Sequence, residues 1–366
     1  MSKPYLSVDS FCGAGGLSYG LHLAGFEIAA AFDLNEMAIQ TFKANVSDRG
    51  FQANIQELTG KQLTKQIGLT QRLDLFAGGP PCQGFSKQKR GAHLGDERNN
   101  LVLEYARLVR ELKPRTFMLE NVDQLGMKRG RDFLDHVQQQ LKDYVLYPRF
   151  YNSADFGVAQ TRPRFITVGV HKEIELIFQP PAPTVKKWKT IREAIGDLPE
   201  PPDDFREHPE YPNHYKTNIT AINIERFSYV PEGGGWQDIP EEIRLPCHQD
   251  VDVTSGGWPD VYGRLRWDAQ VPTITGGFDS FTRGRYGHPK ANRAITPREA
   301  ARLQGFPDWF RFHGNKSEVR AQLGNAVPVP LAEAIGKSIF HLLQVHDGLV
   351  KATSRRCALA GGSSAD

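Results

Sequence analysis

The sequence predicts an α/β protein built on a doubly wound, mostly parallel sheet of the Rossmann-like kind, with a second, smaller module. Strand-like and helix-like segments alternate through residues 1–170, the pattern of a parallel sheet covered by helices on both faces. The composition then shifts, because residues 171–295 contain more than half of the 24 prolines and few helical patterns. These residues therefore predict a separate module, rich in loops and short strands.

The bulk composition is typical of a soluble globular protein, with 39% hydrophobic and 24% charged residues among 366. No apolar run approaches the ~18 residues of a membrane span, and we expect no signal peptide. The 4 cysteines form no close pair, so we expect neither disulfides nor a zinc site, and a reducing cytoplasm fits best. A net charge of +3 permits a nucleic-acid partner without arguing for one.

Short apolar runs predict the strands of the sheet. These strands are residues 5–11, 28–34, 73–77, 116–119, 145–151 and 165–170. Apolar residues at helical spacing predict the helices between them. These helices are residues 17–24, 36–44, 99–113 and 131–144, the third ended by Pro114.

Helical signals return after the proline-rich module. Pro297 stands at the start of a helix that runs to Gln304, and a last helix covers residues 330–343. The final residues are rich in Ser, Ala and Gly, which predicts disorder. We therefore divide the chain into a first domain, the module, a segment returning to the first domain, and a tail: residues 1–171, 172–295, 296–345 and 346–366.

A glycine-rich turn at residues 13–16 follows the first strand and suggests a nucleotide site. The dinucleotide fingerprint G-x-G-x-x-G is incomplete, because Ser18 stands where the third glycine belongs. Asp33 ends the second strand, where a carboxylate can accept hydrogen bonds from both ribose hydroxyls. A ligand with a ribose and no pyrophosphate, such as S-adenosylmethionine, would satisfy both facts. The alternative is a plain tight turn beside an exposed aspartate.

The strongest candidate for chemistry is a cysteine that follows the strand at residues 73–77. Pro80-Pro81-Cys82-Gln83 forms a rigid loop at the carboxyl end of that strand, where open α/β sheets place their active sites. A thiol there can act as a covalent nucleophile if its pKa is lowered or its target is activated. Taken alone, Cys82 is also compatible with a small buried apolar side chain.

Six motifs occur in a fixed order along the chain. They read DSFCGAGGL from Asp9, GPPCQGFS from Gly79, ENV from Glu120, QTRPR from Gln160, REAARLQGFP from Arg298 and QLGNAVP from Gln322. In this order they closely resemble the motifs of the prokaryotic DNA (cytosine-5)-methyltransferase family. The resemblance covers nearly the whole chain outside the proline-rich module and the tail. It implies the fold of an S-adenosylmethionine-dependent methyltransferase.

The resemblance implies catalytic roles for four residues. Cys82 would add to C6 of cytosine, which turns the ring into a carbon nucleophile. Glu120 would protonate or hydrogen-bond N3, and Arg164 would orient Glu120 and bind the cytosine carbonyl oxygen. Arg162 would contact the catalytic loop or a phosphate. From the residues alone, an ordinary ion pair between Glu120 and Arg164 is the alternative.

The resemblance also implies a site for the cofactor S-adenosyl-L-methionine. Its residues would be Phe11 at the adenine, Gly13, Gly15 and Gly16 beside the methionine part, Asp33 on the ribose, Pro80 near the sulfonium, and Asn325 from the returning segment. One position departs from the family pattern, because Asn54 stands where an aspartate usually faces the adenine amine. An amide oxygen can still accept that hydrogen bond.

An enzyme that acts on a base within double-stranded DNA must flip that base out of the helix. The basic loop after Cys82 would hold the DNA through Gln83, Ser86, Lys87 and Lys89, unless it is an ordinary solvated loop. Residues 172–295 would be the target-recognition domain, in which Thr275 resembles the threonine that contacts the flipped nucleotide. Four arginines are candidates for guanine contacts in the major groove: Arg264, Arg266, Arg283 and Arg285.

These inferences predict a monomeric, cytoplasmic, nucleoid-associated DNA cytosine-C5 methyltransferase, either solitary or paired with a restriction endonuclease. A tRNA cytosine methyltransferase with the same core is one alternative, disfavoured by the large recognition module. A DNA-binding relative without activity is another, disfavoured by the intact Cys82, Glu120 and Arg164. The absent third glycine disfavours a hydride-transferring oxidoreductase.

Overall fold

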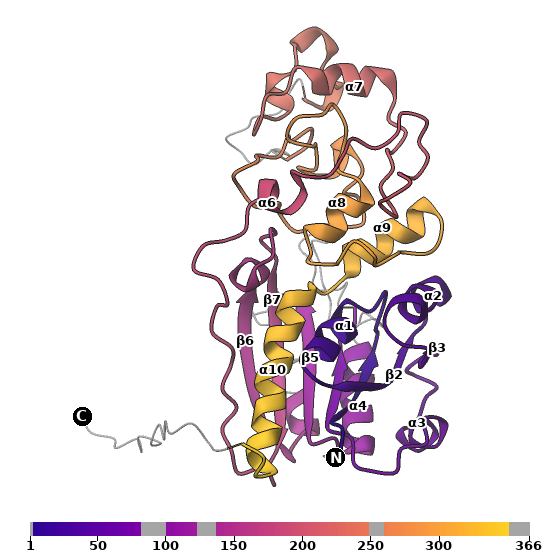
Figure 1. The fold of residues 1–366 in the computed structure, drawn as a ribbon, viewed down its shortest axis with the longest axis vertical. Coiled ribbons are helices and arrows are strands. Elements are labelled where there is room, and N and C mark those ends of the chain that lie inside the picture. The colour runs from indigo at the N-terminus through magenta and orange to yellow at the C-terminus, as the bar shows by residue number, and fades with distance from the viewer. Residues whose placement is uncertain (1–2, 82–99, 123–136, 249–259, 351–366) are drawn as a thin grey trace, which may run out of the picture.

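The computed structural model describes residues 3–81, 100–122, 137–248 and 260–350 of the chain. A seven-stranded sheet with the order β3-β2-β1-β4-β5-β7-β6 forms its lower part (Figure 1). The strands are β1 (Leu6–Ser10), β2 (Glu27–Asp33), β3 (Gly50–Gln52), β4 (Leu75–Gly78), β5 (Thr116–Val122), β6 (Tyr144–Asn152) and β7 (Pro163–His171).

The five strands from β3 to β5 run parallel to their neighbours, whereas β7 is antiparallel to both β5 and β6. The predicted doubly wound, mostly parallel sheet is therefore confirmed. Because of these directions, the carboxyl ends of β1, β2, β4 and β5 and the amino end of β7 meet at one edge. That edge is where an open α/β sheet binds its ligand.

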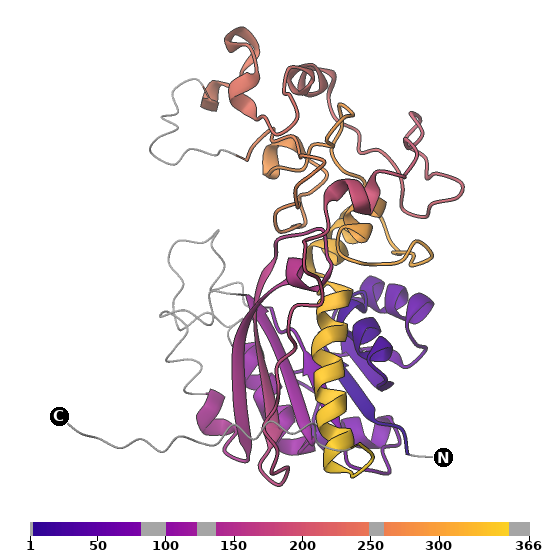
Figure 2. The ribbon, with the colours of Figure 1, turned by 60° about the vertical axis from the view of Figure 1, so that its left-hand side comes forward.

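Helices cover both faces of the sheet. They are α1 (Gly16–Leu23), α2 (Glu36–Asn45), α3 (Gly60–Gln66), α4 (Asn100–Leu112) and α10 (Val329–His346). α1 and α10 pack together on one face, where Leu21 and Ile335 are buried with Met118 of β5 (Figures 1 and 2). The opposite face belongs to α4, whose Tyr105 is buried against Phe117.

The upper part of the molecule consists of short helices joined by loops (Figure 1). The α-helices are α6 (Ile191–Ile195), α7 (Ala221–Ser228), α8 (Pro297–Arg302) and α9 (Lys316–Asn325). The 3-10 turns are η6 (Trp236–Asp238), η7 (Glu241–Ile243), η8 (Pro246–His248) and η10 (Phe281–Arg283), while η5 (Ser153–Phe156) follows β6. The described part of residues 172–295 contains isolated bridges and no strand, so the predicted short strands are wrong. Proline has no N–H for a strand ladder, and prolines recur throughout this module.

One hydrophobic core joins the module to the two helices that follow it. Ile274 and Phe278 are buried together with Ala300 of α8 and Leu323 of α9. The cores therefore do not separate at residue 296, where the sequence analysis ends the module. The chain returns to the helices of the sheet before α10, because the N–H groups of Arg311 and His313 donate to Asn45 and Thr41 of α2. α10 then packs on a face of the sheet.

Several elements differ from the sequence expectations. Neither β3 nor α3 was predicted from the sequence. Residues 137–140 are helical but β6 already begins at Tyr144, so the predicted helix at residues 131–144 ends early; residues 131–136 lie outside the described part. The predicted disorder of residues 346–366 is wrong at Asp347, because its carboxylate accepts hydrogen bonds from Tyr5 at 2.7 Å and Arg115 at 3.0 Å. Residues 351–366 lie outside the described part.

No single helix among the described residues has the length and hydropathy of a membrane span. α9 and α10 meet these criteria only as a pair, which is bent by 41°. Both helices bury apolar side chains in the cores described above.

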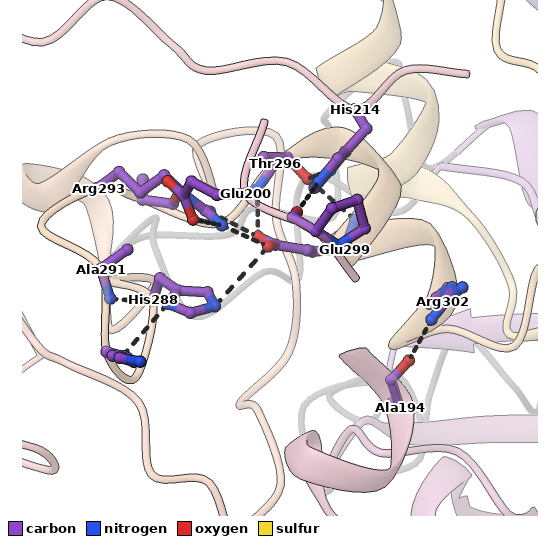
Figure 3. Close-up of polar contacts among 12 residues, drawn as sticks. Ala194, Glu200, His214, His288, Ala291, Arg293, Thr296, Glu299 and Arg302 are labelled. Carbon is purple, nitrogen blue, oxygen red and sulfur yellow. Dashed lines mark hydrogen bonds and ion pairs between the residues drawn. The ribbon is translucent and has the colours of Figure 1, made fainter. Parts of the chain in front are cut away.

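A buried ion-pair network stabilises the start of α8 (Figure 3). Arg293 donates to both carboxylate oxygens of Glu299, at 2.9 and 2.8 Å, and to both of Glu200, at 2.8 and 3.1 Å. Glu299 also completes a capping box with Thr296. Burial raises the pKa of Glu299. The charge and hydrogen bonds of the adjacent Arg293 outweigh this effect, so the pKa falls to about 2.

We predict that Glu299→Gln destabilises the protein by about 3 kcal/mol at neutral pH, because Arg293 stays buried with half of its pairing lost. The pKa of Glu299 is lower in the folded than in the unfolded state. The stability that its carboxylate contributes is therefore complete above pH 4.5 and is lost as the pH falls toward 2. Urea unfolding of both proteins at pH 7 and pH 3.5 measures the gap, which should narrow at the lower pH. A gap of equal size at both pH values would contradict this account.

Candidate active site

A cavity of about 1110 Å³ lies at the carboxyl edge of the sheet, where the strand ends meet segments from the module and α9. It exceeds the usual volume of a site for one small ligand, so it has room for a cofactor and a second group. Most of the predicted cofactor and catalytic residues line it: Phe11, Gly13, Gly16, Asp33, Asn54, Pro80, Glu120, Arg162, Arg164 and Asn325, together with Thr275.

The three glycines of the turn after β1 have different roles. Gly13 has a φ of +52°, and a Cβ there would meet no atom within 4 Å, so its backbone is open to a ligand. Gly15 has a φ of +100°, which favours glycine, and a Cβ there would lie 2.8 Å from Val46. A Cβ on Gly16 would lie 2.4 Å from the carbonyl oxygen of Val327. Gly15 and Gly16 are therefore needed for packing, and the role of all three glycines beside the methionine part stays a prediction.

Asp33 and Asn54 stand at one end of the cavity. The Asp33 carboxylate accepts hydrogen bonds from the N–H groups of Gly13 at 2.9 Å and Asn35 at 2.8 Å. Burial raises the pKa of Asp33, and these hydrogen bonds oppose that shift. Each carboxylate oxygen keeps a lone pair for a ligand hydroxyl. The side chain of Asn54 is engaged locally, because its Oδ1 accepts from the Gln56 N–H at 3.1 Å and its Nδ2 donates to Glu57 at 3.0 Å.

A buried ion pair stands at the other end. Arg164 Nε donates to Glu120 Oε1 at 2.7 Å, and both residues are 9% exposed. The pair forms because β5 and β7 are neighbours, with Val122 opposite Arg164 in the register. Gly79 also packs closely against the Glu120 carboxylate, because a Cβ on Gly79 would lie 2.8 Å from Glu120 Oε2. The arrangement offers a carboxyl group, held by a guanidinium, to whatever occupies the cavity.

Arg162 lines the cavity and is 2% exposed. Its Nη1 donates to the carbonyl oxygen of Ile274 at 2.8 Å and its Nη2 to that of Gly324 at 3.0 Å. Burial lowers the pKa of its guanidinium well below the usual value. Its predicted contact with the catalytic loop concerns residues outside the described part. The bonds that the structure does describe connect two backbone segments.

Arg264 was predicted to contact DNA, and the structure contradicts this. Its side chain is 4% exposed and donates to five groups: the carbonyl oxygens of Val230, His288, Ala291 and Phe227 and the Oδ1 of Asn292. Its guanidinium also lies 4.0 Å from the centre of the Phe227 ring. Arg264 therefore organises the module from within.

Arg285 is partly exposed and bonds within the module, and its predicted DNA contact stays a prediction. It donates to the carbonyl oxygens of Gly233, Gly234 and Arg264 and to the carboxylate of Asp260. Arg266 and Arg283, in contrast, are exposed. The stem of Arg283 lies against Gly277, which follows Thr275 of the cavity lining by two residues.

Five predicted residues lie outside the described part of the chain: Cys82, Gln83, Ser86, Lys87 and Lys89. Their roles remain predictions. Pro80 and Pro81, which precede Cys82 in the sequence, line the cavity.

The sequence analysis assigned no role to Asp9 and none to Gln160 beyond their motifs. Asp9 of β1 is fully buried and accepts a hydrogen bond from the Ser18 hydroxyl at 2.5 Å, which ties β1 to the first turn of α1. Its Oδ1 has no partner among the described residues. Gln160 is fully buried, and its Oε1 accepts from the Ile274 N–H at 2.8 Å. The only sequence signal was the presence of a polar residue inside a motif.

The sheet order and this cavity define a Rossmann-like methyltransferase of the S-adenosylmethionine-dependent fold class. The profile of the C-5 cytosine-specific DNA methylase family matches residues 5–341. The chain therefore belongs to that family and is an enzyme that methylates cytosine in DNA.

Curated relatives agree with this family along nearly their whole length. The Type II methylase M.HgiDII of Herpetosiphon aurantiacus is 34% identical over 92% of this chain and 95% of its own. The Type II methyltransferase M.XorII of Xanthomonas oryzae is 34% identical over 94% of this chain and 86% of its own.

Solved structures agree as well. A prophage-encoded protein of E. coli, assigned to the DNA modification methyltransferases, has a TM-score of 0.70 and 28% identity, over 93% of this chain and 99% of its own. S. pombe Dnmt2 has a TM-score of 0.62 at 16% identity, over 94% of this chain and 100% of its own, and shows the likeness of fold.

We predict that Asp9→Asn gains stability relative to the wild type as the pH rises from 5 to 8, by about 2–3 kcal/mol. Burial raises the pKa of Asp9 from 3.8 to about 7. The stability that this carboxyl group contributes is therefore complete below pH 3.8 and is lost as the pH rises through about 7. Asn carries no charge to bury. Urea unfolding of both proteins across this range tests the account, and a difference that is independent of pH would rule it out.

Proposed function

We propose that the protein transfers a methyl group from S-adenosylmethionine to C5 of cytosine within a specific sequence of duplex DNA. The observation that carries the proposal is the continuity of one cavity between Asp33 and the Glu120–Arg164 pair. A ribose-binding carboxylate and a group that can act on a base thus face the same space. Family membership supports cytosine in DNA as the acceptor.

The residues at the Asp33 end suit S-adenosylmethionine. Asp33 retains lone pairs for the ribose hydroxyls, and the backbone at Gly13 is open to a close ligand. Phe11 lines the same end, and Leu34 is 66% exposed there, which offers apolar surface to an adenine ring. When bound, S-adenosylmethionine supplies an electrophilic methyl group.

At the other end, the chemistry needs a nucleophile and an acid. Cytosine C5 is a poor nucleophile, so we assign to Cys82 the addition of its thiolate to C6, which breaks the C5–C6 π bond and shifts its electron pair onto C5 and, by conjugation, toward N3. Glu120 would donate a hydrogen bond or a proton to N3 as this charge develops. Arg164 would hold Glu120 in place and hydrogen-bond the carbonyl oxygen of the base. After methylation, a base or water takes the C5 proton, the electrons of that C–H bond re-form the C5–C6 double bond, and the Cys82 thiolate leaves from C6.

The DNA would lie between the sheet edge and the module, with the target base flipped into the cavity. Thr275 would contact the backbone of the flipped nucleotide. Of the four candidate arginines, Arg266 and Arg283 are exposed and keep their proposed role in recognition. Because the curated relatives are Type II enzymes, a partner restriction endonuclease that cuts the same sequence belongs to the proposal.

Transfer of a labelled methyl group from S-adenosylmethionine to unmethylated duplex DNA tests the reaction. The wild type should label DNA, and bisulfite sequencing of the product identifies the site. Cys82→Ala should abolish labelling, and Glu120→Gln should reduce it by about 10²–10⁴-fold, the usual contribution of a general acid. Full activity of Cys82→Ala would refute the covalent role, while labelling of tRNA in place of DNA would refute the substrate.

A matched pair of arginine variants tests how the module meets DNA. Arg283→Ala should leave the Tm unchanged. It should weaken binding to a duplex that contains the methylated site by about 1–3 kcal/mol. Arg264→Ala should lower the Tm, because buried carbonyl groups lose their donor. Fluorescence anisotropy and thermal unfolding measure both effects. Unchanged DNA affinity of a folded Arg283→Ala protein would remove this arginine from the interface.

A further inference from the structure

Arg162 stands where three parts of the chain meet. It precedes β7, and its two terminal nitrogens hold the carbonyl oxygens of Ile274 in the module and Gly324 at the end of α9. Its Nε is buried without a partner among the described residues. A buried guanidinium with a free donor is costly, so both carbonyl contacts matter for keeping it in place.

The two segments that Arg162 holds are in backbone contact. A Cβ on Gly324 would lie 2.3 Å from the amide nitrogen of Gly276, so residues 273–276 and the end of α9 cannot shift independently. Gln160 ties only the first of these segments, through the Ile274 N–H. Thr161 and Tyr286 also hold this segment, through hydrogen bonds with Thr273 and Thr275. Among the hydrogen bonds of the described residues, only those of Arg162 join the segment to Gly324.

On its other side, the returning segment touches the glycine-rich turn. Residues 324–327 line the cavity, and the carbonyl oxygen of Val327 lies against Gly16. The packed contacts are thus continuous from Gly16 through Val327 and Gly324 to Arg162, and from there to Ile274. Continuous packing of this kind is a physical route for coupling two sites.

We propose that Arg162 is a positioning residue that couples the two ends of the cavity, so that cofactor and target nucleotide strengthen each other's binding. The inference rests on the proposed function, which assigns the cofactor to the Gly16 end and the flipped nucleotide to Thr275. By thermodynamic linkage, each ligand changes the affinity of the other by the same factor. The planar fork of arginine reaches both carbonyl groups at once, whereas the single ammonium of lysine does not.

The test compares the wild type with Arg162→Lys, using S-adenosylhomocysteine as the probe in two measurements. The first is hydrogen exchange of the amides in residues 273–277, which S-adenosylhomocysteine should slow in the wild type but not in the variant. The second is the Kd for the duplex found by methylation. We expect S-adenosylhomocysteine to lower this Kd about 5-fold or more in the wild type and hardly at all in Arg162→Lys.

Two control variants separate coupling from loss of structure. Arg298→Lys alters another fully buried arginine, which donates to the carbonyl oxygens of Pro212, Pro307 and Phe310 away from the cavity. It should lower the Tm and keep the coupling. Gln160→Leu removes one hydrogen bond to residues 273–276 and leaves both bonds of Arg162 in place, so it should weaken DNA binding and keep the coupling to S-adenosylhomocysteine.

The possible failures are distinguishable. A wild type that binds S-adenosylhomocysteine and methylates DNA, but shows no coupling, would overturn this inference alone. The same holds if Arg162→Lys keeps the wild-type coupling. A wild type that binds no S-adenosylhomocysteine would overturn the proposed function and this inference with it.

Discussion

The close approach of the two ends of the chain at the glycine-rich turn is the constraint on which the cavity depends. Gly16 leaves room for the carbonyl oxygen of Val327. A Cβ on Gly20 would lie 2.5 Å from the Cβ of Ala332. Larger residues at these positions would force α10 away from α1. Because α10 can lie directly on α1, the segment before it reaches the sheet edge and brings Asn325 to the cavity. The site is therefore assembled from both ends of the chain.

Buried arginines hold the parts of the molecule that have few strands. Arg264 and Arg298 each donate to several backbone carbonyl groups of the loop-rich part of the molecule. Arg162 does the same at the cavity. A guanidinium can satisfy several carbonyl groups at once and brings its own charge into the interior. This cost is acceptable where several loops must meet in one arrangement.

The sequence predicted most of the sheet, because hydrophobic periodicity and motifs can be recognised within short stretches of the chain. It also predicted Asp33, Glu120 and Arg164, since each stands at a strand end and the last two also lie inside motifs, and the structure brings all three to one cavity. It failed where a role depends on distant partners. The exposure of an arginine is set by neighbours far along the chain, so Arg264 looked like a DNA contact although it is a core residue. The same reason hid the packing role of Gly16 and the junction at Arg162.

The central claim is that one cavity, closed by both ends of the chain, holds the cofactor next to the Glu120–Arg164 pair. A crystal structure of the protein with S-adenosylhomocysteine tests this most directly. We expect the ribose hydroxyls on Asp33, the amino-acid part beside Gly13, and the sulfur facing Pro80 and the ion pair. Binding outside the cavity, or with the sulfur turned away from Glu120, would contradict the account.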